Sequence, residues 1–324
     1  MPATVNAVLP ERAVGRGRVT ITGSDFSVGD TAEVMLRDTP ARIAFASSRR
    51  LVITIPDEME GGRVPVLLGD RTIGQITIGS VWATGLHQVD NPIFDRAGNL
   101  FVTYSGSRGQ ESPVSIFRVT PEGTREPFAS GIVNATSMAI GPDAKLYVSS
   151  RFEGAVYRVA PDGTPEQVAT DLGVACGIAF DEEGWMLVGD RSGTVFRVRD
   201  GRATAFATLP ASVAAFHLAM SPEGELHVTA PTLGTYDPIY KIDRRGTVTT
   251  IASSLGRPQG LAFGPDHRLY VIDALAGSSG LHRLEADGSF TPVVAGATLV
   301  GVAFGPNGEL VVASNETAYR FDVD

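Results

Sequence analysis

Hydrophobic and polar residues alternate over short runs along most of the chain, and turn-forming residues separate these runs. A period of two places successive side chains on opposite faces of a strand, whereas a helix needs a period near 3.6. Sequences such as GPD at residues 141–143 and PDG at residues 161–163 are typical of tight turns. The 37 Gly and 20 Pro residues suit many such turns. The pattern predicts an all-β protein built from short strands.

A pattern with two anchor positions repeats six times between residues 91 and 312. The second anchor follows the first by seven residues in every copy, and successive first anchors are 46, 40, 40, 43 and 41 residues apart. The first anchors are Ile93, Ala139, Ala179, Ala219, Ala262 and Ala303, and the second anchors are Leu100, Leu146, Met186, Leu226, Leu269 and Leu310. A four-stranded unit of this length predicts a propeller blade, and the mostly small first anchors suit inner strands that converge on a narrow axis.

The sixth copy contains only three predicted strands before the last residue of the sequence. Residues 81–86 (VWATGL) resemble the predicted fourth strands at residues 127–132 (PFASGI) and 250–255 (TIASSL). We therefore expect residues 76–86 to complete the last blade and close a six-bladed ring, which removes two exposed sheet edges.

Residues 1–79 do not share the repeat and form short alternating runs of their own. The sequence GSDF at residues 23–26 and the later strand ITIP at residues 53–56 resemble the IPT/TIG immunoglobulin-like family. The resemblance implies a β-sandwich that serves as a spacer or docking module. The predicted organisation is an IPT/TIG-like sandwich at residues 1–79 and a six-bladed propeller at residues 80–324.

Charge and cysteine content exclude several classes of function. The net charge is −9, and because residues 1–79 hold nine basic and nine acidic residues, the excess lies in the propeller. An acidic propeller argues against nucleic acid or an anionic membrane as partner. The single cysteine, Cys176, excludes an intrachain disulfide and a cysteine-based zinc site. The N-terminus does not resemble a signal peptide, so we expect a cytoplasmic protein.

Candidate binding residues gather on one face of the predicted propeller. The upper face is defined here as the loops that enter each inner strand together with those that join the second and third strands. Three consecutive upper loops contain Arg108, Arg151 and Arg191, and the charged neighbours on this face are Glu153, Asp190 and Asp273. Three guanidinium groups on one rim suit a carboxylate or another small anion. The alternative is that each arginine pairs with a neighbouring carboxylate or carbonyl and braces its loop.

Two rings of residues at the axis are found by counting back from the first anchors. Three positions before the anchors stand Asp90, Thr136, Cys176, Phe216, Gln259 and Val300, and two positions before them stand Asn91, Ser137, Gly177, His217, Gly260 and Gly301. Three other blades place Gly where the fourth has His217. We predict His217 as a general base with Asp190 above it, and Asn91 and Gln259 as substrate contacts. The alternatives for His217 are a metal ligand and a core histidine bonded to a backbone carbonyl. For Cys176, a thiol–imidazole pair with His217 is weighed against a small buried hydrophobe, which is favoured.

The six repeats resemble NHL propellers, and their number resembles the senescence-marker-protein/gluconolactonase family. That resemblance implies a lactonase with a divalent ion on the axis, held by Glu-Gly-Pro, Asn-Gly and Pro-Asp-Gly motifs. The matching positions here read Asp90-Asn91-Pro92, Phe216-His217 and Pro258-Gln259-Gly260. Asp90 is therefore the metal candidate, whereas Phe offers no oxygen and Gln only a neutral one. A divalent cation such as calcium stays open as a cofactor.

Together these features predict a propeller that handles a small molecule in an axial pocket on its upper face. The predicted chemistry is hydrolase-like, of the lactonase type, on a small anionic or lactone substrate. The alternative is a non-catalytic scaffold that binds a protein partner.

Overall fold

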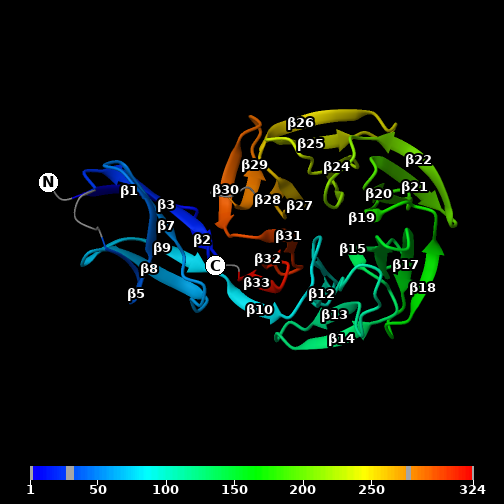
Figure 1. Cartoon of the computed structure of the whole chain (residues 1–324), viewed down its shortest axis with the longest axis horizontal. Coiled ribbons are helices and arrows are strands. Elements are labelled where there is room, and N and C mark those ends of the chain that lie inside the picture. The colour runs from blue at the N-terminus through cyan, green and yellow to red at the C-terminus, as the bar shows by residue number, and fades with distance from the viewer. Residues whose placement is uncertain (1–2, 27–32, 275–278, 323–324) are drawn as a thin grey trace.

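The computed structural model describes residues 3–26, 33–274 and 279–322, and Figure 1 shows a smaller β-lobe beside a ring of sheets around an axis. Strands and turns account for the described residues. None of these residues belongs to a helix that could cross a membrane. The predicted fold class, an immunoglobulin-like sandwich followed by a six-bladed propeller, is confirmed.

Each blade is a four-stranded antiparallel sheet whose first strand is nearest the axis. The first blade contains β11 (Ile93–Phe94), β12 (Leu100–Thr103), β13 (Ile116–Val119) and β14 (Arg125–Ala129). The second contains β15 (Ala135–Ile140), β16 (Leu146–Ser150), β17 (Ala155–Val159) and β18 (Pro165–Ala169). The third contains β19 (Ala175–Phe180), β20 (Met186–Asp190), β21 (Thr194–Arg199) and β22 (Arg202–Thr208).

The remaining blades follow the same order around the ring. The fourth contains β23 (His217–Met220), β24 (Leu226–Thr229), β25 (Asp237–Ile242) and β26 (Val248–Leu255). The fifth contains β27 (Pro258–Phe263), β28 (Leu269–Asp273), β29 (Gly280–Leu284) and β30 (Phe290–Ala295). The sixth contains β31 (Leu299–Phe304), β32 (Leu310–Ser314), β33 (Thr317–Phe321) and β10 (Ser80–Thr84).

The first and second strands pair in the same register in all six blades. In each of them the first anchor pairs with the residue eight positions later; the pairs are Ile93 with Phe101, Ala139 with Tyr147, Ala179 with Leu187, Ala219 with His227, Ala262 with Tyr270 and Ala303 with Val311. These second-strand residues also pack against the next blade. The ring centroids of Tyr147 and Phe180, for example, lie 4.9 Å apart in an edge-to-face arrangement that favours tight blade stacking.

The sixth blade joins the two ends of the propeller. Strand β10 pairs antiparallel with β33, and its Trp82 is buried in a cluster that also contains Leu100 of the first blade. The strand therefore lies within the expected range 76–86 but is shorter, because residues up to Ile78 belong to β9 of the N-terminal lobe.

The N-terminal lobe is a sandwich of two sheets. The first sheet contains β1 (Thr4–Leu9), β3 (Arg18–Ser24), β7 (Arg50–Thr54) and β6 (Arg42–Ala46). The second contains β2 (Arg12–Ala13), β9 (Arg71–Ile78), β8 (Gly62–Leu68), β4 (Val34–Leu36) and β5 (Thr39–Pro40). Their facing side chains form one buried cluster that includes Ile21, Leu36 and Ile53.

A short parallel strand attaches this lobe to the fifth blade. Strand β2 pairs on one side with β9 and on the other with β30, where Arg12 lies opposite Val294 and Ala13 opposite Ala295. The result is a continuous nine-stranded sheet across both parts of the chain, an attachment that the repeat pattern did not predict.

Candidate functional site

Two neighbouring cavities open on the upper face of the propeller. The axial cavity has a volume of about 290 Å³, and its lining includes Gln88, Cys176, Gln259 and Asn315. The outer cavity, at the upper loops of the first three blades and the loop that enters the fourth, has a volume of about 700 Å³. Arg151, Val174 and Arg191 line both cavities, so the two form one connected region around these side chains.

The loop that carries Arg108 is held by a buried asparagine. Asn134 accepts a hydrogen bond from the Gly109 amide at 2.7 Å and donates from Nδ2 to the carbonyl oxygens of Ser105 and Ser107. Asn134 has a φ of +52°, a conformation that Asn tolerates better than most residues. The three bonds fix the loop between β12 and β13 and thereby place Arg108 at the outer cavity.

The loops that carry Arg151 and Arg191 are packed on each other through glycines. A Cβ atom added to Gly154 would lie only 2.5 Å from the carbonyl oxygen of Gly173, and one added to Gly173 would lie 2.7 Å from the carboxylate of Asp190. Asp190 accepts the Val174 amide at 2.8 Å and also the hydroxyl of Ser192. This close packing brings Arg151 and Arg191 to the same part of the rim.

Asp190 and Asp273 have the same structural role in two blades. Each stands at the end of a second strand and accepts backbone amides from the loop entering its own blade, Val174 for Asp190 and both Gly256 and Arg257 for Asp273. These hydrogen bonds hold the entering loops in place. The predicted catalytic role of Asp190 and substrate-binding role of Asp273 stay predictions.

The part of the chain that the structure describes gives the three rim arginines no carboxylate partner. Among the described residues, none makes a hydrogen bond or ion pair with the side chains of Arg108, Arg151 or Arg191. Burial lowers the pKa of Arg151, and the positive charges of Arg191 and Arg108 lower it further, although the interaction with Cys176 raises it. The Glu153 carboxylate, on the same loop as Arg151, instead accepts the Tyr157 hydroxyl at 3.0 Å. The bracing alternative therefore finds no support in the side-chain contacts of these arginines.

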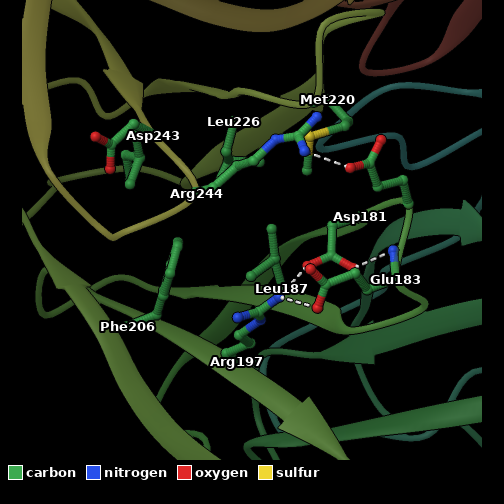
Figure 2. A pocket seen from close by; sticks show the side chains of 12 residues that line it. Asp181, Glu183, Leu187, Arg197, Phe206, Met220, Leu226, Asp243 and Arg244 are labelled. Carbon is green, nitrogen blue, oxygen red and sulfur yellow. Dashed lines mark hydrogen bonds and ion pairs between the residues drawn. The ribbon is translucent and has the colours of Figure 1, made fainter.

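Arginines on the opposite, lower face provide a contrast. Figure 2 shows Arg197 directed at Asp181 and Glu183, with N–O distances of 2.7 and 3.3 Å. In the same region Arg244 lies 2.5 Å from a carboxylate oxygen of Glu182. Arg197, on β21, thus binds a turn of its own blade, and Arg244 links a fourth-blade turn to that same turn. The rim arginines make no such ion pair with a described residue.

His87 reports on the charge at this rim. Burial lowers the pKa of His87, Arg151 lowers it further, and Glu316 opposes the change. We expect Arg151→Ala to raise the His87 pKa, because it removes a neighbouring positive charge. An NMR pH titration of the imidazole measures the shift, with Arg245→Ala on a lower-face turn as control. An unchanged His87 pKa in Arg151→Ala would contradict the placement of Arg151 beside it.

His217 is buried and is not part of the walls of either cavity. Its Nδ1 is 2.6 Å from Oδ1 of Asp90, both side chains are buried, and neither lines the axial or outer cavity. Asp90 Oδ1 also accepts the Asn91 amide at 2.7 Å. His217 Nε2 is buried and has no hydrogen bond to a described residue. The general-base role of His217 stays a prediction, and the partner that the structure gives it is a carboxylate rather than a backbone carbonyl.

The other axial candidates divide between bracing and lining. Asn91 connects two inner strands, because its Nδ2 donates to the Leu261 carbonyl and its Oδ1 accepts the Val302 amide. Gln259 lines the axial cavity. Burial raises the pKa of Cys176 to about 11, and its Sγ donates to the Val174 carbonyl, so the thiol is unsuited to act as a nucleophile.

The residues present do not fit an axial divalent ion. Asp90 uses Oδ1 for His217 and Asn91, and the next positions of the implied ligand set are the fully buried Phe216 and the neutral Gln259. Among the residues that the structure describes, no three His, Cys, Asp or Glu side chains are grouped to hold a metal. Metal binding by Asp90 stays a prediction.

Several residues of the site were not found by sequence reasoning. Gln88 is fully buried at the axial cavity, where its Oε1 accepts the Thr103 amide and its Nε2 donates to the Asp90 carbonyl. Phe152, Val174 and Val213 line the cavities with exposed apolar side chains. Their positions in the sequence, next to the predicted arginines and ring residues, could have indicated them. The alternation of polar and apolar residues, however, does not show which apolar side chains are exposed.

Comparison with protein families identifies the first part of the chain. Residues 3–81 match the family model described as IPT/TIG domain, which covers both sheets of the N-terminal lobe. The N-terminal lobe is an IPT/TIG domain. The resemblance drawn from residues 23–26 and 53–56 is thereby confirmed. No curated protein sequence matches the chain.

Solved structures resemble the chain at low sequence identity. An auxiliary nutrient binding protein from Bacteroides thetaiotaomicron is 11% identical, with a TM-score of 0.61 over 99% of this chain and 98% of that one. A proposed gluconolactonase is 17% identical, with a TM-score of 0.61 over 75% of this chain and 90% of that one. Virginiamycin B lyase from Staphylococcus aureus, a catalytically inactive variant with quinupristin, is 13% identical, with a TM-score of 0.54 over 99% and 96%. These likenesses establish the fold, and function must be argued from the site.

Proposed function

We propose that the propeller binds a small anionic molecule on its upper face, with Arg108, Arg151 and Arg191 as the anion-binding group. The observation that carries this proposal is the convergence, beside two connected cavities, of three guanidinium groups that have no carboxylate partner among the described residues. Guanidinium groups form paired hydrogen bonds with carboxylates, and a half-buried arginine such as Arg151 binds them more strongly than an exposed one.

The size and position of the cavities support a small ligand. Ligand pockets commonly enclose about 300–1,000 Å³, a range that the outer cavity reaches alone. The loops are also held in place before any ligand arrives, by Asn134 on one side and Asp190 on the other. Such preorganisation lowers the entropic cost of binding.

The double variant Arg151→Ala/Arg191→Ala tests the proposal. Calorimetric titration with citrate, benzoate and inorganic phosphate identifies the anion that the intact protein binds best. We expect the double variant to weaken binding of that anion at least about 100-fold, because each lost charge-assisted hydrogen bond costs about 1.5–3 kcal/mol. The melting temperature should stay nearly constant, since neither side chain makes a bond to a described residue.

Arg245→Ala serves as the control, because it removes one positive charge from an exposed lower-face turn. Equal affinities of the double variant and the intact protein would refute the proposal. A loss of stability in the double variant, without any change in affinity, would return the arginines to a bracing role.

The finer form of the proposal is hydrolysis of a lactone or a small anionic ester at this site. His217 is its candidate base, although the side chain lines neither cavity, so the role requires that a substrate reach the buried Nε2. Turnover of a lactone panel is the measurement. If His217 acts as a general base, His217→Gln should lower turnover per folded molecule by about 10²–10⁴-fold, with the folded fraction of the variant checked by circular dichroism. Full activity of the variant on any substrate found would remove His217 from the chemistry.

A protein-binding scaffold is the second candidate function. The observation that favours it is the exposure of Leu233 and Tyr236, 89% and 59%, on the long upper loop of the fourth blade. Exposed apolar side chains of this kind often mark a contact surface. Leu233→Ser would then weaken capture of a defined protein partner without affecting binding of small anions.

A further inference from the structure

Large apolar side chains are unevenly distributed over the described surface. Eight of them are exposed, and five of these lie on upper-face loops of the second, third and fourth blades. The five are Phe152, Val174, Val213, Leu233 and Tyr236. Three of them, Phe152, Val174 and Val213, line the outer or axial cavity beside the rim arginines.

The cavity-lining members of this group are fixed by their surroundings. Phe152 covers Gly109, since a Cβ atom there would lie 2.8 Å from the phenyl ring. The Val174 amide donates to Asp190, and the Val213 amide donates to the Pro231 carbonyl at 2.8 Å. The side chains therefore present apolar surface from defined backbone positions rather than from loose loop tips.

Val174 connects the apolar and cationic parts of the site. It lines both cavities together with Arg151 and Arg191, whereas Phe152 lines the outer cavity and Val213 the axial one. A ligand whose charged end reaches the two arginines would thus have an apolar wall on either side. A highly hydrated anion without an apolar part would leave those walls exposed to water.

We propose that the ligand of this site is an amphipathic carboxylate: its acid group binds Arg151 and Arg191, and its flat or branched apolar body packs against Phe152, Val174 and Val213. This inference rests on the proposed function and specifies its ligand class. The positive charge of the two arginines is the reason for the acid group of the ligand. The cluster of exposed apolar side chains is the reason for its apolar body.

Titrations with three matched probes test the ligand class. The probes are naphthalene-2-carboxylate, its neutral carboxamide, and acetate, which retains the acid group without the apolar body. We expect the naphthoate to bind at least about 10-fold more tightly than either of the others, since burying an aromatic body and pairing its acid each contribute that much or more.

Phe152→Ala tests the apolar wall. It should weaken naphthoate binding about 10-fold and leave acetate binding unchanged, because only the larger probe reaches the phenyl ring. Leu233→Ala is the matched control, since Leu233 is 89% exposed and lines neither cavity. Circular dichroism of each variant checks that the fold is retained.

The outcomes separate this inference from the proposed function. If acetate or citrate binds as tightly as naphthoate and Phe152→Ala changes neither, the amphipathic ligand is wrong and anion binding stands. If the carboxamide binds as tightly as the acid, the arginines do not select the ligand. If no anion binds and Arg151→Ala/Arg191→Ala has no effect, both proposals fail.

Discussion

A chain lacking residues 1–86 is expected to aggregate instead of forming a stable propeller. The deletion removes β10, leaving β33 as an unpaired edge in the sixth blade. It also removes Trp82 and Leu86 from a cluster shared by the first and sixth blades. An exposed edge next to exposed apolar side chains favours association between chains. Solubility and sedimentation of the purified fragment measure the effect.

A chain lacking only residues 1–79 is the matched control, because it loses the IPT/TIG domain but retains β10. This fragment loses the pairing of β2 with two residues of β30 and the packing of Val14 on the core of the fifth and sixth blades, but it keeps the closing strand. It should stay soluble and unfold cooperatively. A soluble, cooperatively unfolding fragment of residues 87–324 would show that closure by β10 is unnecessary.

The architecture was predictable because the repeat contains its own register. A constant seven-residue interval between anchors, with variable loops elsewhere, requires the same hairpin in every copy, and all six blades show it. The closing strand followed from its likeness to fourth strands. The attachment through β2 was not predictable, because two residues, Arg12 and Ala13, are too few to produce a periodic pattern.

The candidate site was predictable only in part. Loop order placed Arg108, Arg151 and Arg191 on one face, and the structure brings them together. Loop order could not separate a carboxylate that faces a ligand from one that accepts backbone amides, as Asp190 and Asp273 do. That distinction depends on the path of each entering loop, which three-dimensional packing determines.

Replacing either member of the buried His217–Asp90 pair is expected to destabilise the propeller strongly. His217 comes from the fourth blade and Asp90 from the segment before the first, so their contact spans the ring. Both side chains are buried. Removing one partner leaves the other buried without its hydrogen bond, which typically costs about 1–3 kcal/mol and more where the remaining group is charged.

The surroundings of the pair leave little room for compensation. A Cβ atom on Gly301 would lie 2.5 Å from the Asp90 carbonyl oxygen, and one on Gly177 would lie 2.6 Å from the Phe216 carbonyl oxygen. The neighbouring inner strands are therefore in close contact at this level. Because interiors packed this tightly relax only partly, His217→Ala should leave a cavity as well as an unpaired carboxylate.

Urea denaturation of His217→Ala, Asp90→Ala and the double variant measures this pair. Each single variant should unfold at a clearly lower urea concentration than the intact protein. The double variant should lose less than the sum of the two, because the second substitution removes a group that the first left unpaired. His267→Asn, at an exposed turn whose positive φ suits Asn, controls for replacing a histidine. Single variants within about 1 kcal/mol of the intact protein, or strictly additive losses, would show that the contact does not stabilise the ring.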